Sequence, residues 1–215
     1  MRSGFGDIPV NSRLHSILSP AYEPCPQYND CKKEGIRWDP PSGHVPRGFC
    51  GAIGRLEEVK LILVVAEPGD PLDKETHTGF ESAFKKAYEC FKNKTTQFHR
   101  NIREILDLCW PNEAFERQMR RVWLTESVLC SAKKETGPVK ASVARACIHR
   151  YLAKQLELFP GALVVALGLK ARDRLRSSGI VDFFHARAAA PPGCNLPPPA
   201  KDSWQKIAEK LRSQA

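Results

Sequence analysis

Short apolar runs recur along the chain, and they have the composition of buried β-strands. They cover residues 59–66, 121–129, 162–167 and 180–184, and each is rich in β-branched, aromatic or other apolar side chains. Runs of this length and composition are typical of strands covered on both faces of a parallel sheet. The pattern therefore predicts four strands.

Helical spacing of apolar residues follows these runs. It indicates helices within residues 84–91, 98–106, 144–156, 168–176 and 204–211. Repeated strand–helix units place helices on both faces of a parallel sheet. We therefore expect an α/β fold, a three-layer α/β/α sandwich around a central, mostly parallel four-stranded sheet.

The N-terminal quarter of the chain differs from the rest. Residues 1–55 are rich in Pro, Gly and polar residues without a sustained period, so we expect a loop-rich segment packing on one α/β domain formed by residues 56–215. No run of eighteen apolar residues occurs, and the first residues lack the apolar stretch of a secretory signal. These features predict a soluble, cytoplasmic protein without a membrane partner, which we take to be a monomer.

Charge and cysteine content narrow the possible partners. Lys and Arg total 33 against 24 Asp and Glu, which gives a formal net charge of +9. This balance suits nucleic acid, although many proteins of such charge bind no polyanion. Eight cysteines in a cytosolic chain indicate metal ligation or simple burial rather than a disulfide framework.

The carboxyl ends of the strands are where open α/β sheets gather their functional groups. Glu67-Pro68-Gly69 follows the first predicted strand, and Glu126-Ser127 lies near the end of the second. Gly168 follows the third, and His185-Ala186-Arg187 the fourth. We therefore expect these four places to form one site.

In this order, these places resemble the motifs of the uracil-DNA glycosylase superfamily, most closely its family 4, the iron–sulfur type. The resemblance runs from about Val59 to Arg187. Val65-Ala66-Glu67-Pro68-Gly69 is similar to that family's Gly-Glu-Ala-Pro-Gly turn, with the acidic residue displaced. Residues 125–130 are similar to the family's Thr-Asn-Val-Val-Lys-Cys stretch, with Glu126 in place of the Asn. The most specific match consists of Cys147, residues 151–156 and residues 165–168, which are similar to the family's cysteine, its Tyr-Leu-x-x-Gln helix and its Val-Ala-Leu-Gly strand. Of the family's last motif, His-Pro-Ser, only the histidine is present in this chain, as His185.

The resemblance implies a DNA-repair glycosylase that flips out uracil, or a related deaminated base, and hydrolyses its N-glycosidic bond to leave an abasic site. Glu67 would orient water and stabilise the sugar, and His185 would donate to the base oxygen. The residues expected to contact the base are Ala66, Pro68, Gly69, Phe80, Glu126 and Ser127. Those expected to contact the DNA are Gly168, Lys170 and Arg187.

Each of these roles has a structural alternative. Glu67 would otherwise be a solvated turn carboxylate, His185 and Arg187 surface loop residues, and Phe80 a core residue. A charged Glu126 would repel O4 of uracil, so either burial raises its pKa or the base preference has changed.

The resemblance also implies a [4Fe–4S] cluster on Cys25, Cys31, Cys130 and Cys147. Zinc in the same four-thiolate site is the alternative, and Cys50 competes with the N-terminal pair. From the residues alone, buried free thiols are the better interpretation.

Two further classes of function stay open. One is a protein of the same fold that binds uracil or damaged DNA with little turnover, or is trapped covalently through the loop of His185. The other is a structural cluster protein or an enzyme acting on another nucleotide substrate. Neither the preferred base nor the choice between single and double strands follows from the residues.

Overall fold

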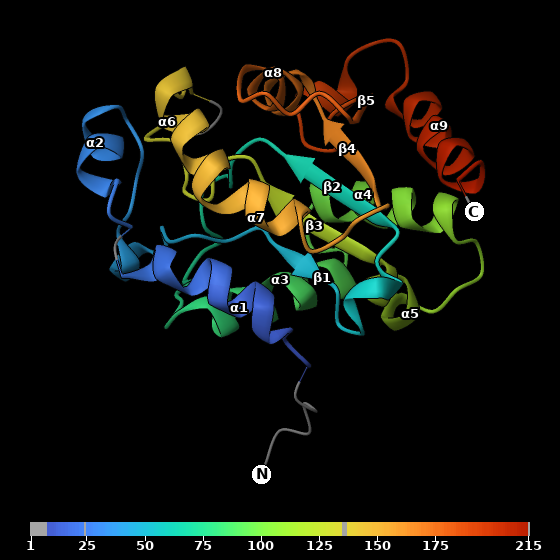
Figure 1. Ribbon diagram of the computed structural model, residues 1–215, viewed down its shortest axis with the longest axis horizontal. Coiled ribbons are helices and arrows are strands. Elements are labelled where there is room, and N and C mark those ends of the chain that lie inside the picture. The colour runs from blue at the N-terminus through green and yellow to red at the C-terminus, as the bar shows by residue number, and fades with distance from the viewer. Residues whose placement is uncertain (1–7, 24, 135–136, 215) are drawn as a thin grey trace.

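A five-stranded sheet forms the centre of the computed structural model, which describes residues 8–23, 25–134 and 137–214 (Figure 1). The strands are β1 (Cys50–Gly51), β2 (Leu61–Val65), β3 (Val122–Glu126), β4 (Leu163–Leu167) and β5 (Phe184–Ala186). Their order is β1-β3-β2-β4-β5; β1 is antiparallel to β3, and the other pairs are parallel. The expected α/β fold with a mostly parallel sheet is confirmed.

The predicted number of strands, four, is wrong, because β1 adds a fifth at the edge of the sheet. β1 is two residues long, too short for any alternation to show in the sequence. Gly51 is required there, because its φ is +111° and a Cβ would lie 2.1 Å from the Val122 carbonyl oxygen. The strand predicted at 180–184 also lies elsewhere: Val181 is 78% exposed, and β5 begins only at Phe184.

The helices of the described residues follow the predicted strand–helix order. They are α1 (Ser12–Leu18), α2 (Tyr28–Lys33), α3 (Phe80–Lys92), α4 (Gln97–Cys109), α5 (Phe115–Arg121), α6 (Ala141–Cys147), α7 (Ala153–Leu156), α8 (Leu169–Ser177) and α9 (Ala200–Arg212). A π-helical turn, Ile148–Leu152, joins α6 to α7, so the single helix predicted there is interrupted. None of the helices in the described part of the chain is long and apolar enough to cross a membrane.

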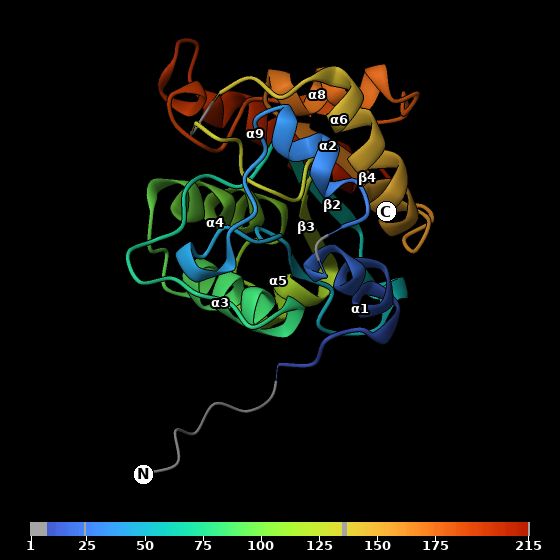
Figure 2. The same ribbon diagram turned by 90° about the vertical axis from the view of Figure 1, so that its left-hand side faces the viewer.

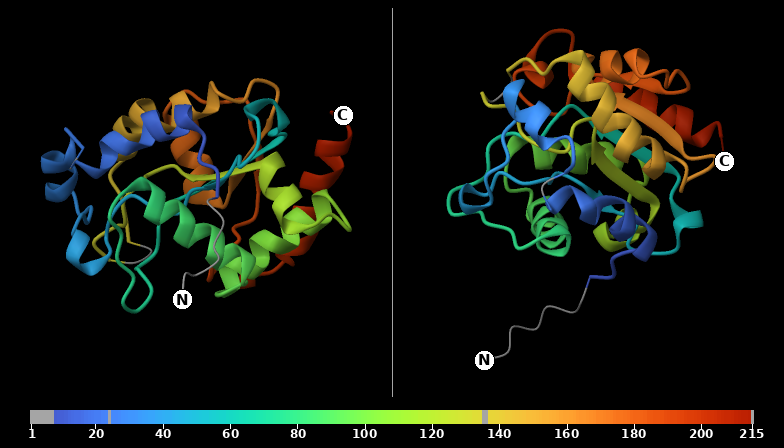
Figure 3. Two further views of the ribbon diagram at one scale, coloured as in Figure 1. Left: turned by 90° about the horizontal axis from the view of Figure 1, so that it is seen from below. Right: turned by 60° about the vertical axis from the view of Figure 1, so that its left-hand side comes forward.

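Alternate residues of β2 enter two separate cores. Leu61, Leu63 and Val65 pack with residues of α4 and α9, whereas Ile62 and Val64 pack with residues of α1, the π turn and α8. Figure 3 shows α1 and α9 on opposite sides of the strands. The sheet is thus covered on both faces, which explains why its central strands are apolar runs rather than alternating ones.

The N-terminal segment packs on the domain through two short helices. Leu14 and Leu18 of α1 are buried in the second core, and the Tyr22 hydroxyl donates to the Pro46 carbonyl oxygen at 2.5 Å. The other helix, α2, lies beside α6 (Figure 2). The segment therefore supplies one edge strand, one patch of core and a helix next to α6.

Candidate functional site

The turn after β2 is held firmly at the carboxyl edge of the sheet. The Ala66 carbonyl oxygen accepts hydrogen bonds from the Val128 N–H at 3.0 Å, the Ser127 hydroxyl at 2.6 Å and Arg174 Nη1 at 2.7 Å. Three donors on one oxygen leave the turn little freedom. Ser127 is buried and engaged with this carbonyl, so it positions the turn that carries Glu67.

Glu67 is a buried, ion-paired carboxylate rather than a solvated one. Its side chain is 6% exposed, and both cations that bind it come from α8. Lys170 Nζ donates to Oε1 at 2.9 Å and also to the Gly137 carbonyl at 2.9 Å. Arg174 Nη1 lies 2.5 Å from Oε2 and forms an ion pair with it. The structure thus excludes the alternative of a solvated turn carboxylate.

Glu126 provides a second carboxyl group on the adjacent strand. It pairs in register with Val65, two residues before Glu67, and is 3% exposed. Its Oε2 is buried without a hydrogen-bond partner among the described residues. Burial and the negative charge of Glu67 raise the pKa of Glu126 well above its usual range, against the charges of Arg47 and Arg174. The raised pKa favours the neutral acid form of Glu126, in line with the first of the two alternatives posed by the sequence.

This raised pKa predicts how stability depends on pH. The folded state keeps a proton on Glu126 that the unfolded state releases above its ordinary pKa of 4.5, so this contribution to stability is lost as pH rises from there. A Gln side chain does not titrate, so changing Glu126 to Gln removes this pH-dependent contribution to stability. We expect the variant's gain in unfolding free energy over wild type, measured by urea unfolding, to grow as pH rises above about 5.

The matched control for this experiment is Glu81→Gln, because the Glu81 side chain is 78% exposed. This control should track wild type at every pH. Parallel curves for Glu126→Gln and wild type would contradict a raised pKa of Glu126.

Gly48 closes the space beside Glu126. Its φ is +89°, and a Cβ there would lie 2.3 Å from Oε1 of the buried Glu126 side chain. We expect Gly48→Ala to cost about 1–2 kcal/mol for the left-handed backbone and about 1–3 kcal/mol more for overpacking. Gly161→Ala is the control, since Gly161 has φ +83° with nothing within 4 Å of its Cβ position. Equal losses in the two variants, measured by urea unfolding, would show that Glu126 does not fill this space.

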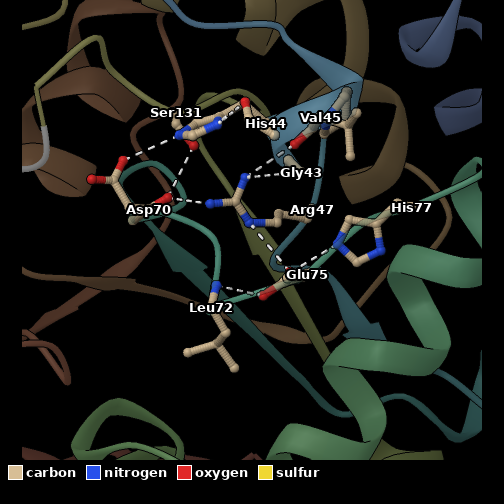
Figure 4. A network of polar contacts seen from close by, with 12 residues as sticks. Gly43, His44, Val45, Arg47, Asp70, Leu72, Glu75, His77 and Ser131 are labelled. Atoms are coloured by element: carbon tan, nitrogen blue, oxygen red, sulfur yellow. Dashed lines mark hydrogen bonds and ion pairs between the residues drawn. The ribbon is translucent and has the colours of Figure 1, made fainter.

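Arg47 ties the turn to the N-terminal segment (Figure 4). Its Nη2 donates to the Gly69 carbonyl, and its Nη1 lies 3.4 Å from the carbonyls of Gly43 and Val45. Its Nε is 3.7 Å from Glu75 Oε1. Burial lowers the pKa of Arg47, although neighbouring carboxylates, Glu75 first, oppose this shift.

Polar side chains extend this network on both sides of Arg47 (Figure 4). His77 Nε2 lies 2.8 Å from Glu75 Oε1, and the Leu72 N–H donates to Glu75 Oε2 at 2.8 Å. His44, with a side chain 5% exposed, has Nε2 3.3 Å from Asp70 Oδ1. Sequence reasoning missed this network. Its only signal was a His and an Arg inside a Gly- and Pro-rich stretch, His44 to Gly48, directly before a strand too short to detect.

His185 is not brought together with Glu67. It pairs with Ala166 of β4, which pairs with Val64 of β2, so it stands two strands away and level with a residue three positions before Glu67. Burial and the positive charges of Arg172 and Arg176 lower the pKa of His185. His185 therefore lies within β5 rather than on the loop that follows the strand.

Other expected site residues have structural tasks. Phe80 is 3% exposed and stacks on Phe49 with ring centroids 5.1 Å apart, which favours the core interpretation over base stacking. The Arg187 guanidinium donates to the carbonyls of Gly193, Leu196 and Pro197 and so ties down the loop after β5. Three more of the expected site residues, Pro68, Gly69 and Gly168, lie at the same edge of the sheet as Glu67. Pro68 is buried, Gly69 is exposed, and Gly168 directly precedes α8 with a φ of +91°.

Cys25, Cys31, Cys130 and Cys147 meet at a second place, one cavity between α2, α6 and the segment after β3. All four are free thiols. Burial raises the pKa of Cys147 to about 12 and the pKa of Cys130 well above its usual range, and the other thiols of this group raise both further. Cys50 does not line the cavity and lies in the core against β3.

The donor set fits a group bound by four thiolates. Such buried thiols lose their protons when a cation replaces them, and two buried donors without partners, Trp38 Nε1 and the Tyr151 hydroxyl, belong to residues lining the same cavity. A zinc ion needs its sulfurs about 2.3 Å from one point. Within the described ranges, no three Cys, His, Asp or Glu side chains form such a single-ion site. In a [4Fe–4S] cluster each thiolate binds its own iron, so the thiols need not meet at one point.

No protein-family model matches this sequence, and no curated protein is similar enough to count as a relative.

Proposed function

We propose that this protein excises uracil, or a related deaminated base, from DNA by hydrolysing the N-glycosidic bond. The observation that carries the proposal is the pair of carboxyl groups at the ends of β2 and β3. Glu67 is an ion-paired carboxylate, whereas Glu126 is buried with a raised pKa. A carboxylate held by two cations, beside a second carboxyl group of raised pKa, suits acid–base chemistry at a glycosidic carbon.

Glu67 suits the sugar side of the reaction. Breaking the bond leaves positive charge on the sugar, and a carboxylate nearby stabilises that charge and orients the attacking water. Lys170 and Arg174 hold the carboxylate in one orientation. A group positioned in advance of the reaction needs no rearrangement when charge develops.

Glu126 is suited to form hydrogen bonds with the excised base. Uracil and hypoxanthine both present an N–H beside a carbonyl oxygen, and a neutral carboxyl group offers one acceptor and one donor to that edge. Oε2 of Glu126 lacks a protein partner among the described residues, so its bonding capacity is open to a ligand. We assign to Glu126 the hydrogen bonds that the resemblance assigns to an Asn. The donor role expected of His185 is not favoured by its place in β5.

Basic residues near this edge suit a DNA backbone. Lys170, Arg172 and Arg176 lie on α8, which begins at the carboxyl end of β4, and the net charge of the chain is +9. Phosphate contacts by several such residues make affinity fall steeply with salt. In this proposal the partner is uracil-containing DNA, met by a monomer in the cytoplasm.

The proposed cofactor is a [4Fe–4S] cluster held by Cys25, Cys31, Cys130 and Cys147. When bound, it would join the N-terminal segment, the segment after β3 and α6 through metal–thiolate bonds, and it would be able to accept or give an electron. The thiolates come from parts of the chain far apart in sequence, so the cluster adds to the packing of α2 on the domain.

The proposal is tested with labelled DNA strands, single and paired, that carry uracil, hypoxanthine or no lesion, followed by alkali to cut abasic sites. We expect cuts only at the lesions and binding that weakens steeply with salt. If no strand is cut but a lesion-specific complex survives denaturation, the protein is a binding or trapping protein instead. Weak binding with little salt dependence would remove DNA as the partner.

A further inference from the structure

Two buried polar atoms on residues of the four-cysteine cavity form no well-aligned hydrogen bond among the described residues. They are Trp38 Nε1 and the Tyr151 hydroxyl, both buried atoms on residues that line the cavity with the four thiols. Buried donors in folded proteins are nearly always hydrogen-bonded, so an orphan needs an explanation. Both orphans lie where a ligand of the four cysteines would sit.

The sequence and local geometry direct Tyr151 at this cavity. It follows Cys147, the last residue of α6, by four residues; it lies within the π turn Ile148–Leu152, and only 3% of it is exposed. Burial raises the pKa of the Tyr151 hydroxyl, and a side-chain hydrogen bond with the Cys25 thiol raises it further. π turns within α-helices occur often at functional sites. Here the candidate ligand Cys147 ends α6 and the donor Tyr151 lies in the π turn that follows, and both line the cavity.

Tyr28 holds Trp38 in place. Its ring lies 5.5 Å from that of Tyr28, and the Tyr28 hydroxyl donates to the Trp38 carbonyl oxygen at 3.1 Å. Tyr28 also lines the cavity, but its hydroxyl is already committed to that carbonyl. The cavity therefore has one hydroxyl committed to a carbonyl, a second hydroxyl beside the Cys25 thiol, and one N–H, that of Trp38, without a partner among the described residues.

We infer that Trp38 and Tyr151 donate hydrogen bonds to the sulfur atoms of the proposed cluster and act as positioning residues for its electronic state. The inference rests on the proposed cofactor. Sulfur atoms of a cluster accept hydrogen bonds, and such donors stabilise the more negative, reduced state. Both residues therefore raise the reduction potential of the cluster, and neither is a metal ligand.

The test uses the full chain, loaded anaerobically with iron and sulfide, as wild type, Tyr151→Phe, Trp38→Phe and Tyr88→Phe; Tyr88 packs on Phe115 in the other core and does not line the cavity. Iron and sulfide content are measured first, then the midpoint potential by redox titration followed by electron paramagnetic resonance. We expect equal loading, a lower potential in Tyr151→Phe and Trp38→Phe, and the wild-type potential in Tyr88→Phe. Iron–sulfur stretching modes should shift in D₂O for wild type and shift less in Tyr151→Phe.

The outcomes distinguish failure of the proposed cofactor from failure of the donor roles of Trp38 and Tyr151. A wild-type protein that takes up no iron, or takes zinc instead, overturns the proposed cofactor and this inference with it. Normal loading with unchanged potentials and unchanged D₂O shifts in both donor variants overturns the inference alone. If Trp38→Phe fails to load, Tyr151→Phe decides the question, because it removes one atom from the cavity and leaves the ring in place.

Discussion

Changing Glu67 to Gln is expected to lower the rate of uracil excision by about 10²–10⁴-fold, the usual size of acid–base assistance by one positioned group. Gln keeps the size of the side chain and an oxygen for Lys170 Nζ, which now lies 2.9 Å from Oε1. It removes the negative charge that would stabilise the sugar and orient water. The loss should therefore be in the chemical step, with binding of a uracil strand retained.

Single-turnover rates on a uracil strand, with protein in excess, measure this loss directly. Glu81→Gln is the matched control, because it removes the same charge from an exposed side chain on α3. Urea unfolding of both variants checks that the fold is intact. Excision by Glu67→Gln at the wild-type rate would rule out Glu67 as the water-orienting group.

Changing Arg174 to Met is expected to lower the free energy of unfolding by about 3–5 kcal/mol, the usual cost of breaking a buried ion pair from one side. The Arg174 side chain is 10% exposed, and the Glu67 side chain opposite it is 6% exposed. The same nitrogen, Nη1, also donates to the Ala66 carbonyl and lies 3.2 Å from the Ser127 hydroxyl. The variant thus leaves a buried carboxylate with one cation fewer and two oxygens with one donor fewer.

Urea unfolding near neutral pH measures the effect. Arg176→Met is the control, since Arg176 lies on the same helix but is exposed. Its change should stay below about 1 kcal/mol, as for other surface charges. Equal, small losses in both variants would mean that the Arg174–Glu67 pair is solvated. Because Met keeps most of the side-chain volume, a large loss would come from the lost charge and hydrogen bonds rather than from a cavity.

Local patterns were enough to locate most of the sheet. Leu61 to Val65 and Leu163 to Leu167 are apolar runs because both faces of a central parallel strand are covered, and this burial leaves its mark directly in composition. The positions of Glu67 and Glu126 followed from the strand ends, and the predicted convergence of Cys25, Cys31, Cys130 and Cys147 agrees with the cavity they line.

The register of the strands and the pairing of the edge strands β1 and β5 could be seen only in the tertiary structure. β1 has two residues and no pattern of its own, and the start of β5 depends on its pairing with β4. Because pairing places His185 level with Val64, a residue that sequence order put at the site lies inside the sheet instead.

The sequence by itself determined the fold class, the central strands and the two acidic strand ends, because each depends on local composition and chain order; the set of four cysteines came from the resemblance. Only the tertiary structure decided that Glu67 is ion-paired with α8, that Glu126 is buried beneath Gly48, and that Arg47 holds the turn between them. Burial and charge pairing depend on residues up to about a hundred positions away, such as Arg174 for Glu67. A carboxyl group's protonation state follows from those distant neighbours, and no local pattern records them.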